Sequence, residues 1–198
     1  MLRLILLSGR ELRRYRKQTG GAEMRSGFAV YPFPFGQLMI GWQGDAVTLL
    51  KRTDEPAREE GRTPLTGLVF RQVSEYLEGR RREFDFPYLL EGTEFQRKVW
   101  RALCEIPYGE TRTYGEVAAA VGNPKAYRAV GMANHQNPIL IAVPCHRVIG
   151  ADGRLVGYGS GLDMKEALLR LEKRAAQEER RPGAAGIRGE QSSGKTRR

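Results

Sequence analysis

A cysteine and a histidine stand side by side at positions 145 and 146, and this pair is the first candidate for chemistry in the 198-residue chain. A thiol with a pKa of about 8.5 is only a few per cent thiolate at neutral pH, so a nucleophilic cysteine needs a neighbouring base or positive field. His146 and Arg147 directly follow Cys145. Cys104, the other cysteine, has no histidine near it in sequence and lies on a predicted apolar helix face. We therefore expect Cys145 to be the nucleophile and Cys104 to be a packing residue.

For Cys145 and His146 to react together, other groups must connect them and orient the histidine. In an extended segment adjacent side chains point to opposite sides, so Cys145 and His146 would meet directly only if the backbone turned. A water relay between them is the more economical arrangement. A catalytic histidine also needs an orienting carboxylate, and Glu172 on the last predicted helix is the candidate. The alternative, from residue types alone, is that Cys145 is an inert core cysteine after an apolar run.

Helix-start signals predict the elements that hold these residues in the second half of the chain. Two capping boxes and one N-cap with a first-turn proline indicate three helices. The second and third, joined at Gly122 and Asn123, form a helix-turn-helix candidate. A last helix carries Met164, Leu168 and Leu171. The start signals are Thr93 with Gln96, Thr113 with Glu116, and Asn123 with Pro124.

The segment before the cysteine is short and apolar. Asn137 and Pro138 break the third helix, and residues 139–143 run into Pro144. The run is too short for a helix, so we predict a buried strand or extended segment that presents Cys145 at its end.

The first half of the chain indicates a small sheet covered by a helix. Strands are expected at residues 28–35, 37–42 and 46–50, with a hairpin around 43–45. Thr63 and Pro64 open a helix that Gly79 stops. The following segment is strand-like at Phe84 and Phe86.

The predicted class is α+β, with a small N-terminal sheet and helix domain and a mostly helical C-terminal domain that contains a winged helix-turn-helix-like unit. The expected division is an extension of uncertain role at 1–23, an N-terminal α/β domain at 24–92, a C-terminal domain at 93–177 and a disordered basic tail at 178–198.

Composition narrows the class of partner. The chain is 40% hydrophobic and carries a formal net charge of +10, and a basic surface draws a protein onto nucleic acid. Residues 123–136 contain Lys125 and Arg128 and no acid. The longest early apolar run, residues 4–7, is far too short to span a membrane and makes a poor signal peptide, so we expect an intracellular protein with reduced thiols.

Several motifs resemble those of the O6-alkylguanine-DNA alkyltransferases and occur in the same order and spacing. The segment from Pro144 to Gly150, which reads PCHRVIG, resembles the active-site signature of that family. The resemblance is strong over 93–174 and general over 28–92. The other matching segments are TYGEVA at 113–118, GNPKA at 122–126, RAVG at 128–131, NP at 137–138 and GL at 161–162.

The resemblance implies a protein that flips a damaged nucleotide out of duplex DNA and transfers its alkyl group irreversibly to Cys145. It gives Tyr114 the role of proton donor to the base and Arg128 that of the finger that fills the vacated space. The alternatives are helix packing for Tyr114 and a phosphate contact for Arg128. The resemblance also implies DNA contacts by Thr113, Lys125, Ala126 and Ala129. Tyr127, between them, is bulkier than the alanine expected at that position. The residues implied for the base pocket and hinge are Asn137, Val148, Tyr158, Gly159 and Ser160.

The implied activity is that of a methylated-DNA–protein-cysteine methyltransferase, acting once per chain on O6-alkylguanine in double-stranded DNA and on O4-alkylthymine. We expect a monomer with no membrane partner that lies in the cytoplasm, or in the nucleus or nucleoid where its DNA is. Some members of the family hold a structural zinc, but residues 1–92 contain no cysteine or histidine, so we predict no metal and no cofactor.

Three rival hypotheses remain at this point. An alkyltransferase-like damage sensor would keep the fold but replace the cysteine. A helix-turn-helix regulator would need a base-reading helix richer in polar side chains than residues 126–133. A thiol hydrolase using Cys145 and His146 would turn over many times.

Overall fold

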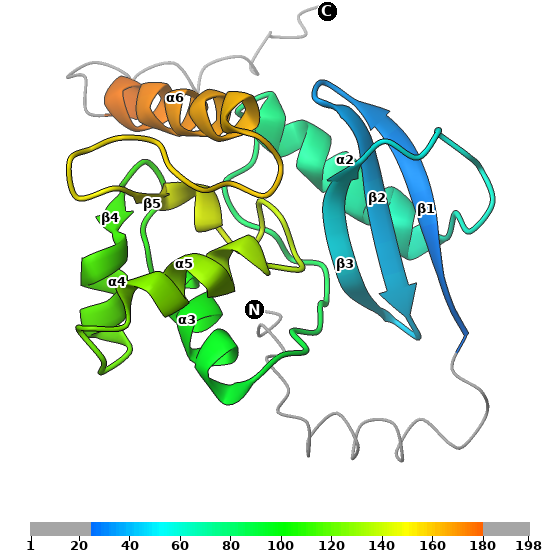
Figure 1. Cartoon of the computed structure of the whole chain (residues 1–198). Coiled ribbons are helices and arrows are strands. Elements are labelled where there is room, and N and C mark those ends of the chain that lie inside the picture. Colours follow the sequence, from blue (N-terminus) through cyan, green and yellow to red (C-terminus); the bar gives the residue numbers. More distant parts are fainter. Residues whose placement is uncertain (1–24, 180–198) are drawn as a thin grey trace, which may run out of the picture.

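The computed structural model describes residues 25–179. The extension expected at 1–23, and the expected tail from residue 180 onward, lie outside the described residues. Figure 1 shows two parts side by side, a three-stranded sheet with one helix, and a group of helices around short turns. The last helix runs to Glu179, two residues into the segment predicted as tail.

The sheet is an antiparallel meander in the order β1 (Ser26–Phe33), β2 (Gly36–Gln43) and β3 (Ala46–Thr53). Gly44, with φ of 57°, occupies the tight turn between β2 and β3, as the hairpin prediction requires. The first strand, predicted at residues 28–35, lies two residues earlier in the chain, because Pro34 and Phe35 form the turn into β2. The three-stranded prediction is otherwise confirmed.

Helix α2 (Pro64–Leu77) covers the sheet, as predicted. Thr63 caps it, and Gly79 follows it with φ of 74°. Its residues Val69 and Val73 join Leu38 and Ile40 of β2 in the core. Alternate positions along a strand and three- or four-residue spacing along a helix produce this apolar interface.

No strand forms at Phe84 or Phe86, so that prediction was wrong. Their rings pack against each other and against Tyr76 and Tyr88 instead, with neighbouring ring centroids 5.3 to 6.0 Å apart. Pro87 has no backbone N–H to donate to a neighbouring strand. The segment pairs with the sheet through a single β-bridge, between Tyr88 and Val47.

The second half contains α3 (Glu94–Cys104), α4 (Tyr114–Ala120), α5 (Tyr127–His135) and α6 (Leu162–Glu179). The strands β4 (Arg112–Thr113) and β5 (Val148–Ile149) form a short parallel pair. Both predicted capping boxes are present, at Thr93 and at Thr113.

The predicted start of α5 was wrong. Its N-cap is Ala126, which makes no side-chain cap bond. The amide of Ala126 donates to the carbonyl of Asn123 over 2.9 Å, closing a turn in which the residue before Pro124 is not helical. Helix α5 therefore starts at Tyr127, after this turn.

The approach to Cys145 is buried as predicted, but it is not a strand. Asn137 supplies the reason, because its Oδ1 accepts from the Ile139 amide and its Nδ2 donates to the Val143 carbonyl. A side chain that binds nearby backbone in this way bends the chain. Ile141 has φ of 68°, and a 3-10 turn, η1 (Cys145–Arg147), follows.

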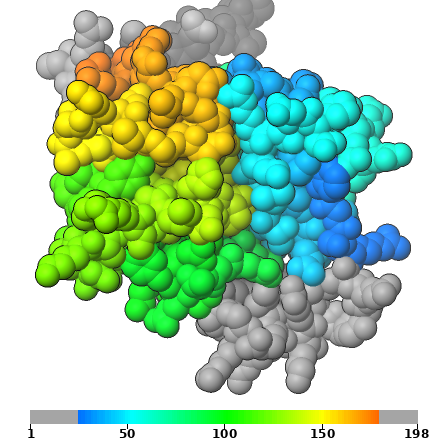
Figure 2. All heavy atoms as spheres, in the orientation of Figure 1, coloured from blue at the N-terminus to red at the C-terminus, as the bar shows by residue number. Residues whose placement is uncertain are grey.

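One hydrophobic core extends through both parts, from Ala29 in β1 to Leu168 in α6. Figure 2 shows the N-terminal part, in blue and cyan, packed along a seam against the green, yellow and orange C-terminal part. Within residues 25–179, no helix is long and apolar enough to cross a membrane.

Candidate active site

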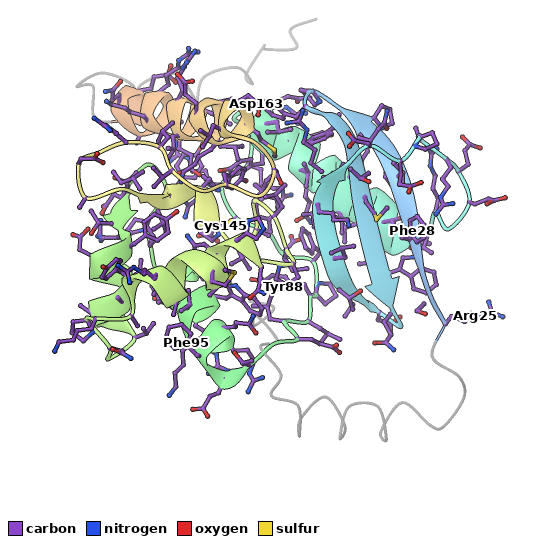
Figure 3. The ribbon with its side chains drawn as sticks, viewed as in Figure 1. Arg25, Phe28, Tyr88, Phe95, Cys145 and Asp163 are labelled. Carbon is purple, nitrogen blue, oxygen red and sulfur yellow. The ribbon has the colours of Figure 1, made fainter. Side chains whose placement is uncertain are left out.

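Cys145 begins the 3-10 turn η1 and is only 4% exposed. Figure 3 shows it near the middle of the molecule. The Asn137 Nδ2 atom donates to its Sγ over 3.0 Å, so the amide that bends the chain also contacts the thiol. Side chains point to opposite sides only along an extended strand, and η1 is a turn. The expectation that Cys145 and His146 point to opposite sides therefore does not apply here.

Burial raises the pKa of the Cys145 thiol to about 11, against partial opposition from the Asn137 amide and the Lys165 ammonium. The resting thiol is therefore neutral at pH 7. A reaction through the thiolate requires a base that accepts the proton while the substrate is in place.

His146 is fully buried, and its Nε2 atom lies 2.7 Å from Glu172 Oε1. Burial lowers the pKa of His146, so the ring is neutral at pH 7. With an ionised carboxylate at Nε2, the hydrogen-bond pattern assigns the proton to that nitrogen. Nδ1 has no hydrogen-bond partner among residues 25–179, which leaves it free to accept a proton.

Glu172 is the centre of a buried polar cluster. Its carboxylate accepts from His146, Arg147, Tyr76 and the backbone amide of Gly109. Burial opposes its ionisation, but the hydrogen bonds from His146 and Arg147 and the positive charge of Arg147 outweigh that cost and lower its pKa to about 2. The sequence predicted the contact between His146 and Glu172, and the structure brings them together. It did not predict Tyr76, Arg147 or Gly109 as further partners.

Lys165 was also missed. It is buried, and its Nζ donates to the carbonyls of Val148, over 2.6 Å, and Val156, over 2.9 Å. Burial lowers the pKa of Lys165 to about 8. Its ammonium thus links β5 to the loop between β5 and α6.

Cys145 lines a cavity of about 180 Å³ at the seam between the two parts. Four predicted pocket residues line it with Cys145, whereas Val148 does not; the Val148 carbonyl accepts a hydrogen bond from Lys165. The β3 residues and Asn134 were not predicted, since sequence does not reveal which strand edge meets the active-site turn. The lining comprises residues 49–52 of β3 together with Asn134, His135, Asn137, Leu140, Cys145, Tyr158, Gly159 and Ser160.

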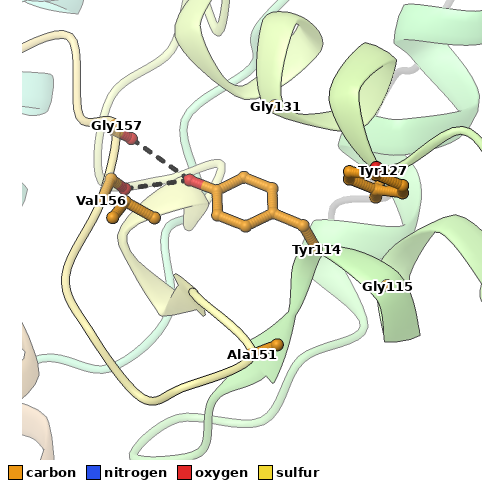
Figure 4. Close-up of a pocket in the computed structure, with 7 residues that line it drawn as sticks. All are labelled: Tyr114, Gly115, Tyr127, Gly131, Ala151, Val156 and Gly157. Carbon is orange, nitrogen blue, oxygen red and sulfur yellow. Dashed lines mark hydrogen bonds between the residues drawn. The ribbon is translucent and has the colours of Figure 1, made fainter.

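Tyr114 lies at a second, larger cavity of about 600 Å³, formed by α4, α5 and the loop after β5. Its hydroxyl donates to the carbonyls of Val156 and Gly157, over 3.0 and 3.4 Å (Figure 4). Burial raises the pKa of Tyr114, so the phenol keeps its proton. Tyr127 and Gly131 of α5 line the same cavity.

The predicted DNA-contact residues cluster around α5. Arg128, Ala129 and Lys125 are exposed, and Ala126 is partly buried. The Tyr127 ring is 48% exposed, with the Arg128 guanidinium 5.5 Å from its centroid. Thr113 caps α4 through its hydroxyl, as predicted. The arrangement presents a basic, acid-free helix beside the Tyr114 cavity.

No group of three or more histidine, cysteine, aspartate or glutamate side chains within residues 25–179 is placed to hold a metal ion.

The family of 6-O-methylguanine DNA methyltransferase DNA-binding domains matches residues 94–174. Alignments with methylated-DNA–protein-cysteine methyltransferases from Methanosarcina barkeri and Methanosarcina mazei are 62% and 64% identical. They cover 52% and 53% of this chain but only 65% and 66% of those relatives.

Longer alignments also exist. The relative of the same name from Methanosarcina acetivorans is 48% identical over 151 residues, covering 73% of this chain and 97% of that protein. The crystal structure of Mycobacterium tuberculosis OGT in complex with DNA is 46% identical, with a TM-score of 0.68, and covers 75% of this chain and 93% of that one. The chain therefore belongs to the methylated-DNA–protein-cysteine methyltransferase family.

Proposed function

We propose that this protein repairs DNA by transferring a methyl or larger alkyl group from O6 of guanine, and from O4 of thymine, to Cys145. The observation that carries the proposal is the buried hydrogen bond between Glu172 and His146, the residue that directly follows Cys145. Cys145 lines the cavity, and the Nδ1 atom of His146 has no hydrogen-bond partner among residues 25–179, so it can accept a proton. The names of the aligned relatives support the same reaction.

The proton of the Cys145 thiol passes to His146 Nδ1 through a bridging water, while Glu172 holds the proton on Nε2. The thiolate attacks the alkyl carbon, a C–S bond forms, and the bond from that carbon to O6 breaks. The base leaves as an anion that Tyr114 protonates on the ring, and the imidazolium proton restores the phenol. For this step the Tyr114 hydroxyl must leave Val156 and Gly157, its present acceptors.

The product is a thioether, and neither water nor a nearby side chain can hydrolyse so unactivated a bond. Each chain therefore acts once. Arg128 fills the space left by the flipped nucleotide, Lys125 binds phosphate, and the small side chains of Ala126 and Ala129 permit close approach to the groove. We place the protein, as a monomer, in the cytoplasm or nucleoid, where its DNA substrate lies.

Intact mass measurement tests the proposal. After incubation with duplex DNA containing O6-methylguanine, the wild-type chain should gain one methyl group, and Cys104→Ala should gain the same. Cys145→Ala should gain none. Tight DNA binding without a mass gain would instead identify a damage sensor, and repeated turnover would identify a hydrolase.

A further inference from the structure

Arg52, near the end of β3, joins the N-terminal sheet to the start of α6. Its Nη1 atom donates to the Ser160 carbonyl over 3.0 Å and to the Asp163 carboxylate over 3.0 Å. These two acceptors stand 108 and 111 residues later in the chain. Figure 3 shows Asp163 at the end of α6 nearest the sheet. One guanidinium thus bridges the seam between the two parts of the molecule.

The carbonyl that Arg52 binds belongs to a segment that lines the Cys145 cavity. Residues 158–160, the 158–160 segment, line this cavity together with Arg52 itself. Just before the segment, the Val156 carbonyl accepts from the ammonium of Lys165 over 2.9 Å. The 158–160 segment is therefore held by a cation on each side, one from α6 and one from β3.

Gly161 allows the guanidinium and the carboxylate to meet beside the backbone. Its φ is 94°, a conformation that residues with a side chain rarely adopt. A Cβ atom at this position would overlap Oδ1 of Asp163 and lie 3.2 Å from Nη1 of Arg52. A hydrogen bond from the Met164 amide, with a contribution from Arg52, lowers the pKa of Asp163, so the carboxylate is ionised at pH 7. The contact is thus a charge-assisted one.

We propose that Arg52 is a positioning residue for alkyl transfer, which acts through the Ser160 carbonyl to hold the 158–160 segment in place while a substrate reacts at Cys145. The inference rests on the proposed function and adds to it a residue of the N-terminal part. Transfer requires close alignment of the nucleophile and the alkyl carbon, so a displaced cavity lining slows it.

The exposure of the ion pair gives this role a signature. The Arg52 and Asp163 side chains are 35% and 60% exposed, so salt in the solvent screens their attraction. The rate of alkylation should therefore depend on salt even with an uncharged substrate.

The test measures the second-order rate of Cys145 alkylation by free O6-benzylguanine in the full-length protein. This substrate is uncharged, so neither DNA binding nor electrostatic attraction contributes to the rate. We expect Arg52→Met to react about fivefold more slowly than the wild type at low salt, the size that one exposed, charge-assisted contact allows. Arg52→Lys retains a cation that can donate to the Ser160 carbonyl, so it should react faster than Arg52→Met.

Salt separates a positioning role from a general loss of packing. Raising the salt concentration from about 0.05 M to about 1 M shortens the range of exposed charges. The wild-type rate should then fall towards that of Arg52→Met, whose own rate should hardly change. Arg170→Met breaks another exposed ion pair, with Glu166 on α6, and should keep both the wild-type rate and its salt response.

Hydrogen exchange at the Gly161 amide reports on the segment without any reaction. This amide donates to the Tyr158 carbonyl over 3.1 Å, which closes the turn that contains Ser160. It should exchange about fivefold faster in Arg52→Met than in the wild type, because the turn opens more often, while the urea midpoint stays close to that of the wild type. Arg170→Met should exchange at the wild-type rate.

Three outcomes overturn the inference while leaving the proposed function intact. They are an equal low-salt rate in the wild type and Arg52→Met, the same salt response in both proteins, and slower alkylation with unchanged exchange at Gly161. If the wild type formed no benzyl adduct on Cys145, the proposed function would fail and the positioning role with it. Exchange at Gly161 would still show whether Arg52 holds the segment.

Discussion

Replacing Glu172 by glutamine should destabilise the fold strongly and in a pH-dependent way. The carboxylate has a pKa of about 2 against an ordinary value of 4.5. Lowering the pKa of Glu172 from 4.5 to about 2 on folding corresponds to about 3 kcal/mol of stability at pH 7. Removing one partner of a buried ion pair costs about 3 to 5 kcal/mol by mutational experience, which agrees, because Arg147 loses its charge partner.

The sign of the pH dependence follows from the lowered pKa. Stabilisation by Glu172 is complete above about pH 4.5 and is lost as the pH falls towards 2, when the folded-state carboxylate becomes protonated. Urea unfolding, followed by tryptophan fluorescence, should show a gap between wild type and Glu172→Gln of about 3 kcal/mol at pH 7. At pH 3 the gap should shrink to about 1 kcal/mol.

The same helix offers a matched control. Glu166 is exposed and pairs with Arg170 one turn along α6, so Glu166→Gln should change stability by at most about 0.5 kcal/mol. A Glu172→Gln gap below about 1 kcal/mol at pH 7, or one equally large at pH 3, would refute the view that this carboxylate is ionised and anchors the cluster.

Three further predictions concern DNA access, the loop and acid sensitivity. Arg128→Ala should slow repair of duplex DNA far more than reaction with free O6-benzylguanine, and equal losses would count against a base-flipping role. Lys165→Met should release the carbonyls of Val148 and Val156 and slow alkylation of Cys145 about tenfold, measured as the second-order rate with O6-benzylguanine, whereas exposed Lys173→Met should not. Because burial lowers the folded-state pKa of His146 below 6.5, wild-type stability should begin to fall as the pH drops below about 6.5, and His146→Gln should lack this first decline in urea titrations.

The helices were the most predictable part of the fold. Their start signals are local, since the side chain of Thr93 or Thr113 binds an amide three residues later in the same segment. The errors occurred where tertiary contacts override local pattern. Phe84 and Phe86 have strand-forming side chains but find ring partners instead of a strand. The bend after α5 depends on one amide, that of Asn137, which binds on both sides of the turn.

Part of the candidate site was also predictable from the sequence, and part depends on tertiary packing. The sequence predicted that Cys145, His146 and Glu172 act together, and the structure places the last two in contact. Lys165 could have been found, because it stands on the same face of α6 as Leu168 and Glu172, at spacings of three and seven residues, where a charge is unexpected. The β3 wall of the cavity and the Tyr76 contact come from the packing of the two parts, which no local pattern encodes.

The central claim is that Cys145 is consumed by the reaction. It is tested most directly by titrating a fixed amount of protein with duplex DNA containing O6-methylguanine and counting restored guanines per chain. Restoration should reach a plateau at one guanine per chain, with the methyl group recovered on the peptide that contains Cys145. Restoration that continues beyond one per chain, or a methyl group recovered on any other residue, would contradict the account.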